Sequence, residues 1–135
     1  EKNIKKLARK LGIEDKVIFT GFVPTEELPF LINGAEALVL PSLWEGFGIP
    51  PLEAMACGTP VIVSNVSSLP EVVGDAGLLV DPTSVTQIEQ AIRTITSDKK
   101  LREKKIKKGL EQVSKFSWEK MAKIVLKVFE EVTNA

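Results

Sequence analysis

Four short apolar runs most constrain what this chain can fold into, because none of them alternates apolar with polar residues. A strand with one face in water alternates, whereas a strand covered on both faces is apolar throughout, as in a parallel sheet. Segments with helical spacing separate the runs, and parallel strands need such crossover connections. The runs that we predict to be strands are residues 17–20, 37–41, 60–64 and 77–81.

Helical segments lie before, between and after the predicted strands. Apolar residues recur at helical spacing in residues 2–12, where Gly12 suits a C-terminal cap. Further helices are expected from Thr25 as N-cap, from Pro50 or Pro51 to Gly58, and from near Ser84, Asp98 and Ser117. This order predicts an α/β fold, a three-layer Rossmann-like sandwich with a short, about four-stranded parallel sheet. Its α/β core would span residues 1–97, followed by a helical C-terminal tail over residues 98–135.

The composition indicates one globular domain and excludes several kinds of chemistry. The chain has 135 residues, 44% of them hydrophobic, and 18 basic residues balance 18 acidic ones, so no net charge marks a nucleic-acid binder. The absence of histidine excludes a Ser-His-Asp hydrolase and a His-ligated metal. A single cysteine, Cys57, with no signal peptide or long apolar run, predicts a cytoplasmic protein.

A basic cluster in the predicted tail has two interpretations. Seven lysine and arginine residues lie within residues 99–108. Such a run is typical of a solvated helix face, and the alternative is a peripheral contact with a membrane surface or with an acidic partner.

The region that indicates chemistry is residues 43–64, in which Glu45 and Glu53 stand around two glycines and two prolines. A loop here would follow the carboxyl end of a buried strand, which is where open parallel sheets bind ligands. Gly46 and Gly48 would let a ligand approach the backbone closely, and the next helix would direct its positive dipole end at the same space.

These features together favour a nucleotide sugar. Helix-start amides bind an anion such as phosphate, and carboxylates accept hydrogen bonds from sugar hydroxyls. The structural alternative is that Glu53 only complements the helix dipole and that the glycines and prolines only shape a turn. A dinucleotide enzyme is disfavoured, because no G-x-G-x-x-G follows any predicted strand.

Longer motifs give a more specific indication. The segments PSLWEGFGIPPLEAMACGTPVIVS, LPEVVGD and GLLVDP, in this order and spacing, resemble the carboxyl-terminal domain of the family 4 retaining glycosyltransferases. These enzymes have the GT-B architecture of two facing Rossmann-like domains, and the resemblance covers nearly the whole chain, as half of a GT-B carboxyl-terminal domain. It implies glycosyl transfer, mannosyl or glucosyl, from a nucleotide diphosphate sugar, with retention and without a metal or other cofactor.

The resemblance also implies roles for individual residues. Glu45 would be the catalytic carboxylate beside the donor sugar, and Glu53 would bind the nucleotide ribose. Phe22 and Val23 would form the edge of the pocket that contacts the base. The backbone amides implied to bind the sugar and diphosphate are those of Gly46, Phe47, Gly48, Ile49 and Leu52.

The chain also departs from the family pattern. Family members open this domain with two further βα units, which carry a glycine-rich loop and a basic pair that grips the diphosphate, and an acceptor-binding amino-terminal domain precedes them. We therefore expect a domain fragment that binds the donor weakly and is inactive as the isolated chain. The alternative is a non-catalytic folding unit or interaction module derived from the family.

The absent units would leave a gap in the sheet. In the doubly wound strand order 3-2-1-4-5-6, they separate residues 17–20 from residues 37–41. We expect these two runs to pair directly through a right-handed crossover, and the alternative is a homodimer or swapped arrangement that fills the gap.

Overall fold

The sheet in this computed structural model, which describes residues 2–133, consists of three parallel strands in the order β1-β2-β3. β1 (Leu38–Leu40) pairs with the central β2 (Val61–Ser64), which in turn pairs with β3 (Leu78–Val80). Val39 lies opposite Ile62, and Ile62 lies opposite Leu78. All four residues of β2 are buried, as expected for a strand covered on both faces. The three runs predicted after residue 36 are therefore confirmed as strands.

Helices make up most of the remaining described residues. They are α1 (Lys2–Lys10), η1 (Glu14–Lys16), α2 (Leu28–Asn33), α3 (Ile49–Ala56), α4 (Leu69–Val73), η2 (Gly74–Ala76), α5 (Val85–Ser97), α6 (Lys99–Val113) and α7 (Trp118–Thr133). Ser84, Asp98 and Ser117 accept hydrogen bonds from first-turn amides, as N-caps do. Gly12 follows α1 with a φ of 68°, a conformation that glycine adopts easily. These predicted helix ends are confirmed.

The start of α2 differs from the prediction. We expected Thr25 to be the N-cap, but the amides of Glu27 and Leu28 both donate to the Pro24 carbonyl, at 3.0 and 3.1 Å, in a turn. The helix begins only at Leu28, with Pro29 in its first turn. A proline without an amide fits that turn and not a later one, so Pro29 places the start of the helix after Thr25.

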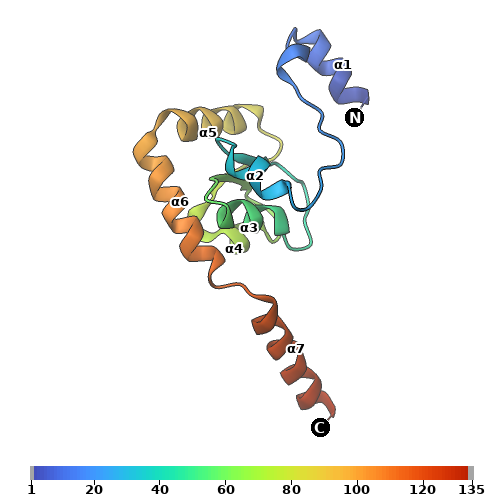
Figure 1. Ribbon diagram of the computed structural model, residues 1–135, viewed down its shortest axis with the longest axis vertical. Helices are drawn as coiled ribbons and strands as arrows, with labels where there is room; N and C mark the ends of the chain where they lie inside the picture. The colour runs from blue at the N-terminus through green and yellow to red at the C-terminus, as the bar shows by residue number, and fades with distance from the viewer. Residues whose placement is uncertain (1, 134–135) are drawn as a thin grey trace.

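Helices cover both faces of the sheet (Figure 1). On one face, Met55 of α3 and Leu69 of α4 form a buried cluster with Val63 of β2. On the other face, Ile95 of α5 packs in a second cluster with Ile62 of β2. The protein therefore has the predicted three-layer α/β arrangement around a small sheet.

α6, which the sequence assigned to the helical C-terminal tail, packs on the α/β body formed by the sheet and its covering helices. Gly109 of α6 is buried, and a Cβ added there would lie 3.1 Å from Cγ of Met55 in α3. Gln112 Nε2 donates to the Val72 carbonyl of α4 at 3.0 Å. The predicted tail thus divides into α6, which covers the core, and α7, which has no buried residue.

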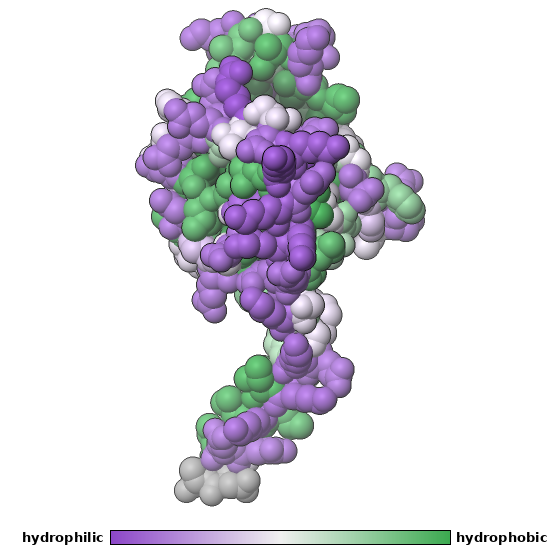
Figure 2. Space-filling view, turned by 90° about the vertical axis from the view of Figure 1, so that its left-hand side faces the viewer, coloured by the Kyte–Doolittle hydropathy of each residue, from purple (hydrophilic) through white to green (hydrophobic). Residues whose placement is uncertain are grey.

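α1 and α7 stand away from the body at its two ends (Figure 1). Ala8 is the one residue of α1 that is buried, and the other buried hydrophobic residues described all lie between Ala54 and Ile95. Figure 2 shows apolar surface on the outlying α7. Its exposed apolar residues include Met121, Ile124, Val125, Val128, Phe129 and Val132. No helix within residues 2–133 is long and apolar enough to cross a membrane.

Residues 17–20 do not form the fourth strand that the sequence predicted, and they do not pair with β1. They lie in the irregular connection between η1 and α2, where the Ile18 side chain is 86% exposed. Apolar, β-branched residues favour a strand only where a neighbouring strand can take up the backbone hydrogen bonds. Among the described strands, β1 has β2 as its one neighbour, so its outer edge is open. The prediction of direct pairing is therefore wrong.

Candidate functional site

The acid loop, residues 41–48, connects β1 to α3 and lies at the carboxyl end of β1 as predicted. Its Glu45 is half-buried, and Glu53 of α3 is exposed, so neither carboxylate is sealed in the apolar core. The hydroxyl of Ser42 donates to Glu45 Oε1 at 2.8 Å. Ser64, fully buried at the end of β2, donates to the Ser42 carbonyl at 2.6 Å. A chain of hydrogen bonds therefore connects the buried end of β2 to the Glu45 carboxylate.

Two serines in the β2–α4 connection hold the acid loop at its backbone. Ser67 Oγ donates to the Glu45 carbonyl at 2.6 Å and accepts from the Glu45 amide at 3.2 Å. Ser68 Oγ is placed to donate to the Phe47 carbonyl, at 2.8 Å, and to the Glu45 carbonyl, at 3.2 Å. Glu45 is thus held at its amide, its carbonyl and its carboxylate.

Gly48 ends the acid loop in a conformation and a space that suit glycine. It is the N-cap residue of α3, with φ 105° and ψ 56°, and it is buried. A Cβ added at this position would lie 2.8 Å from Cδ2 of Leu69, which is itself fully buried. A side chain there would be strained by both the backbone angle and the contact.

The start of α3 leaves a row of amides unused. Within the described residues, four successive amides donate to no protein acceptor, namely those of Gly46, Phe47, Gly48 and Ile49. Pro50 and Pro51 have no amide to offer. Glu53 lies further into α3, where its amide can donate to the Ile49 carbonyl one turn earlier. The available donors therefore include the amides of the loop and of the first helical residue.

Aromatic side chains form the outer side of the acid loop. Trp44 is 77% exposed, and the Phe47 ring packs edge-on against the ring of Phe116, with centroids 6.0 Å apart. Phe116 belongs to the connection between α6 and α7. The loop is therefore supported by a residue that lies far from it in the sequence.

The structure brings the predicted donor-binding residues together, with the exception of the predicted base-contacting pair. Residues 45–49, Leu52 and Glu53 belong to one loop and the helix that follows it. Phe22, at 89% exposed, and Val23 lie instead in the connection that leads to α2, and no hydrogen bond or ring contact among the described residues joins them to the acid loop. Within residues 2–133, no group of three or more Cys, Asp or Glu side chains is placed to hold a metal ion.

Three members of the basic cluster are engaged within the protein. The guanidinium of Arg102 pairs with Glu36 just before β1. Lys105 Nζ donates to the Gly77 carbonyl at 2.8 Å, and burial lowers the pKa of its ammonium. Lys108 Nζ lies 3.1 Å from Asp75 Oδ2. These contacts attach α6 to the body, which leaves fewer free cations for a membrane or acidic partner than the sequence suggested.

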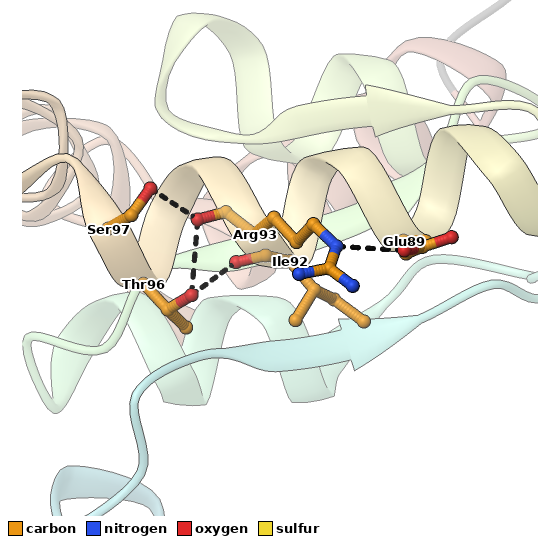
Figure 3. A network of polar contacts seen from close by, with 5 residues as sticks. All are labelled: Glu89, Ile92, Arg93, Thr96 and Ser97. Atoms are coloured by element: carbon orange, nitrogen blue, oxygen red, sulfur yellow. Dashed lines mark hydrogen bonds and ion pairs between the residues drawn. The ribbon is translucent and has the colours of Figure 1, made fainter.

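α5 carries a further polar network on its exposed side (Figure 3). Arg93 Nε lies 2.8 Å from Glu89 Oε1, and Ser97 Oγ donates to the Arg93 carbonyl at 2.7 Å. Every contact in this network joins residues three or four positions apart, so the network consists of local contacts on the helix surface.

The four serines that hold the acid loop were not identified from the sequence. Ser42, Ser64, Ser67 and Ser68 lie in two segments that are separated by α3, and only the fold brings them to one place. The one local signal is the run SNVSS, which begins at the last residue of β2, since serines in turns often make side chain to backbone hydrogen bonds.

Comparison with known proteins identifies the family to which the chain is similar. Residues 1–112 match the family model described as "Glycosyl transferases group 1". Over 106 residues, the chain is 51% identical to the O-antigen chain mannosyltransferase B of Escherichia coli, a match that covers 78% of this chain and 28% of that protein. It is also 38% identical over 130 residues to the MMP alpha-(1->4)-mannosyltransferase of Mycolicibacterium hassiacum, covering 93% of this chain and 32% of that one.

A solved structure is similar over almost the entire chain. The sucrose-phosphate synthase of Thermosynechococcus elongatus superposes with a TM-score of 0.89 and 34% identity, over 98% of this chain and 34% of that chain. The chain thus spans about a third or less of the relatives described here, and its Rossmann-like α/β fold is half of a GT-B domain. On the match over residues 1–112, this chain belongs to the group 1 family of glycosyltransferases.

Proposed function

We propose that this chain is the part of a retaining glycosyltransferase that binds the nucleotide-sugar donor. The observation that carries the proposal is the acid loop, which places a half-buried carboxylate next to a row of unused amides. This site lies at the carboxyl end of a parallel strand, where ligands bind in open α/β sheets. The names of the mannosyltransferase relatives support mannosyl transfer by the whole protein and GDP-mannose as the first donor to test.

In this proposal, the residues around the acid loop bind different parts of the donor. The amides of Gly46, Phe47 and Gly48, at the positive end of the α3 dipole, bind the diphosphate. Glu45 accepts hydrogen bonds from hydroxyls of the sugar, and Glu53, exposed on α3, accepts from the ribose hydroxyls. The same amides stabilise the negative charge that develops on the departing diphosphate. Phe22 and Val23 are assigned to the base on the resemblance alone.

The isolated chain is proposed to bind the donor weakly and to transfer no sugar. It spans 28% of the E. coli mannosyltransferase and 34% of the sucrose-phosphate synthase, so most of either protein has no counterpart in it. Two lysines of α6 are already engaged, Lys105 with the Asp75 and Gly77 carbonyls and Lys108 with the Asp75 carboxylate. In this proposal amides bind the diphosphate and these two lysines supply no cation to it, which lowers affinity.

Titration of the isotope-labelled chain with GDP, UDP and GDP-mannose, followed by NMR, tests donor binding. We expect shift changes concentrated in residues 45–53, and an affinity lowered about tenfold in Glu45→Gln and Glu53→Gln, because hydrogen bonds from ligand hydroxyls to a charged acceptor are lost. Glu103→Gln on α6 is the matched control, since Glu103 is exposed and lies outside the site. Shift changes outside the acid loop, or none at all with any of the three ligands, would contradict the proposal.

A second candidate is a non-catalytic interaction module, and the open outer edge of β1 with the exposed apolar residues of α7 favours it. Thermal unfolding with and without nucleoside diphosphates separates the two functions. A ligand that binds the native state raises the melting temperature, whereas a module without a donor site shows no change.

A further inference from the structure

The serine pair, Ser67 and Ser68, departs from ordinary local preferences in two ways that favour contact with the acid loop. Ser67 has a φ of 60° and is the one residue other than glycine with a positive φ among residues 2–133. That conformation is unfavourable for any residue with a Cβ atom, because the Cβ crowds the backbone. Some other interaction must therefore hold Ser67 in place.

Ser68 gives up the interaction that its position would normally provide. It occupies the N-cap of α4, where a serine hydroxyl usually accepts from a first-turn amide, but it makes no such bond. Its hydroxyl points instead to the carbonyls of Phe47 and Glu45, at 2.8 and 3.2 Å. The Ser68 hydroxyl therefore bonds the acid loop and leaves the first-turn amides of α4 without a side-chain cap.

The bonds of the serine pair converge on one residue. Ser67 Oγ closes a ring with Glu45 by donating to its carbonyl at 2.6 Å and accepting from its amide at 3.2 Å. With both backbone groups of Glu45 held, the direction of its side chain is set, and Ser42 then fixes the carboxylate at 2.8 Å. The adjoining Gly46 has no side chain and adds no restraint of its own.

We propose that Ser67 and Ser68 are positioning residues, which hold Glu45 and the neighbouring free amides in the arrangement that receives the donor. The proposal rests on the proposed function for its ligand, but the restraint itself is a property of the unliganded chain. The energetic reason is preorganisation: a loop already held in the binding arrangement loses less conformational freedom when the ligand binds.

The first test measures the restraint without ligand. In Ser67→Gly, the backbone accepts the positive φ but both hydrogen bonds to Glu45 are gone. NMR-detected hydrogen exchange should then show faster exchange of the Glu45 amide, about fivefold or more, while the melting temperature changes little, because relief of the positive-φ strain offsets the lost hydrogen bonds. An unchanged Glu45 exchange rate in Ser67→Gly would overturn the proposal, whether or not the chain binds a nucleotide.

The second test links the restraint to binding. Ser68→Ala should weaken GDP binding about fivefold, and Ser68→Thr, which keeps the hydroxyl at a helical backbone conformation, should restore it. Ser97→Ala is the control, because the Ser97 hydroxyl bonds only within α5 (Figure 3). If Ser68→Ala binds GDP as the unaltered chain does, the serine pair does not position the site.

The two proposals fail in different ways. If the unaltered chain binds none of the nucleotides, the donor-binding proposal fails, and the serine pair is then judged on the exchange rate of Glu45 alone. If the chain binds GDP and the serine variants change neither exchange nor affinity, donor binding stands and the positioning role is overturned.

Discussion

The ring of Phe47 in the acid loop packs edge-on against the ring of Phe116, with centroids 6.0 Å apart and planes at 77°. This is a favourable geometry for two aromatic rings, since the positive edge of one meets the negative face of the other. Phe116 follows α6, so the contact joins the acid loop to a segment 69 positions later in the chain. The body of the protein thus includes the connection before α7, although α7 itself is exposed.

Replacing Phe116 with alanine should loosen the acid loop. An aromatic pair contributes about 0.5–1.5 kcal/mol beyond its burial, so we expect the free energy of unfolding to fall by about 1–2 kcal/mol. Exchange of the Phe47 amide should become faster. Phe129→Ala on α7 is the control, because Phe129 is 64% exposed. Equal losses of stability in the two variants would show that the Phe47 contact adds nothing.

Gly48→Ala should destabilise the protein more than a glycine substitution elsewhere with positive φ. Gly48 has φ 105° and its added Cβ would lie 2.8 Å from Leu69, whereas Gly12 has φ 68° and nothing within 4 Å of an added Cβ. We expect Gly12→Ala to cost about 1 kcal/mol from backbone strain and Gly48→Ala roughly 3 kcal/mol, because the contact adds to the strain. Urea unfolding of both variants measures the difference. If both variants lose the same free energy of unfolding, the Leu69 side chain moves away from the added Cβ without cost.

Asp75 should make stability depend on pH in the acid range. The hydrogen bond and charge of Lys108 hold the pKa of the Asp75 carboxyl below its usual 3.8 in the folded protein. A carboxyl with a depressed pKa stabilises the fold above its unfolded pKa, and that contribution is lost as pH falls through the folded value. In Asp75→Asn, the free energy of unfolding should therefore fall less steeply below pH 3.8.

Asp81 provides an internal control for the cause of the lowered pKa of Asp75. The pKa of its carboxyl is also lowered, but by hydrogen bonds from Thr83 and not by a lysine. An NMR titration of Lys108→Met should move the pKa of Asp75 up towards 3.8 and leave that of Asp81 unchanged. A parallel change in both carboxyls would point to the net charge of the protein and not to the Lys108 contact.

Substitution of Ile18 distinguishes an exposed connection from a buried strand. The Ile18 side chain is 86% exposed, while Ile62 of β2 is fully buried. We therefore expect Ile18→Ala to change the free energy of unfolding by less than about 0.5 kcal/mol and Ile62→Ala to lower it by about 2–5 kcal/mol. Chemical denaturation at several protein concentrations measures both values. A large, concentration-dependent loss in Ile18→Ala would indicate that residues 17–20 pair with a second copy of the chain.

The sequence by itself determined the local elements of this protein. Apolar runs without alternation identify β1, β2 and β3, because a strand covered on both faces has no polar side. The caps at Ser84, Asp98 and Ser117 are equally local, since a side-chain oxygen bonds an amide two or three residues away. The position of Glu45, just after a strand and before a helix start, also follows from this order.

The tertiary structure alone decided which segments meet. Residues 17–20 have the composition of a strand but not its structure, because a strand exists only where another backbone completes its hydrogen bonds. Ser67 contacts Glu45 across 22 positions of sequence, and Phe116 contacts Phe47 across a still longer interval. No periodicity encodes such contacts, since they depend on how α3, α4 and α6 pack around one small sheet. That packing sets the conformation of the acid loop.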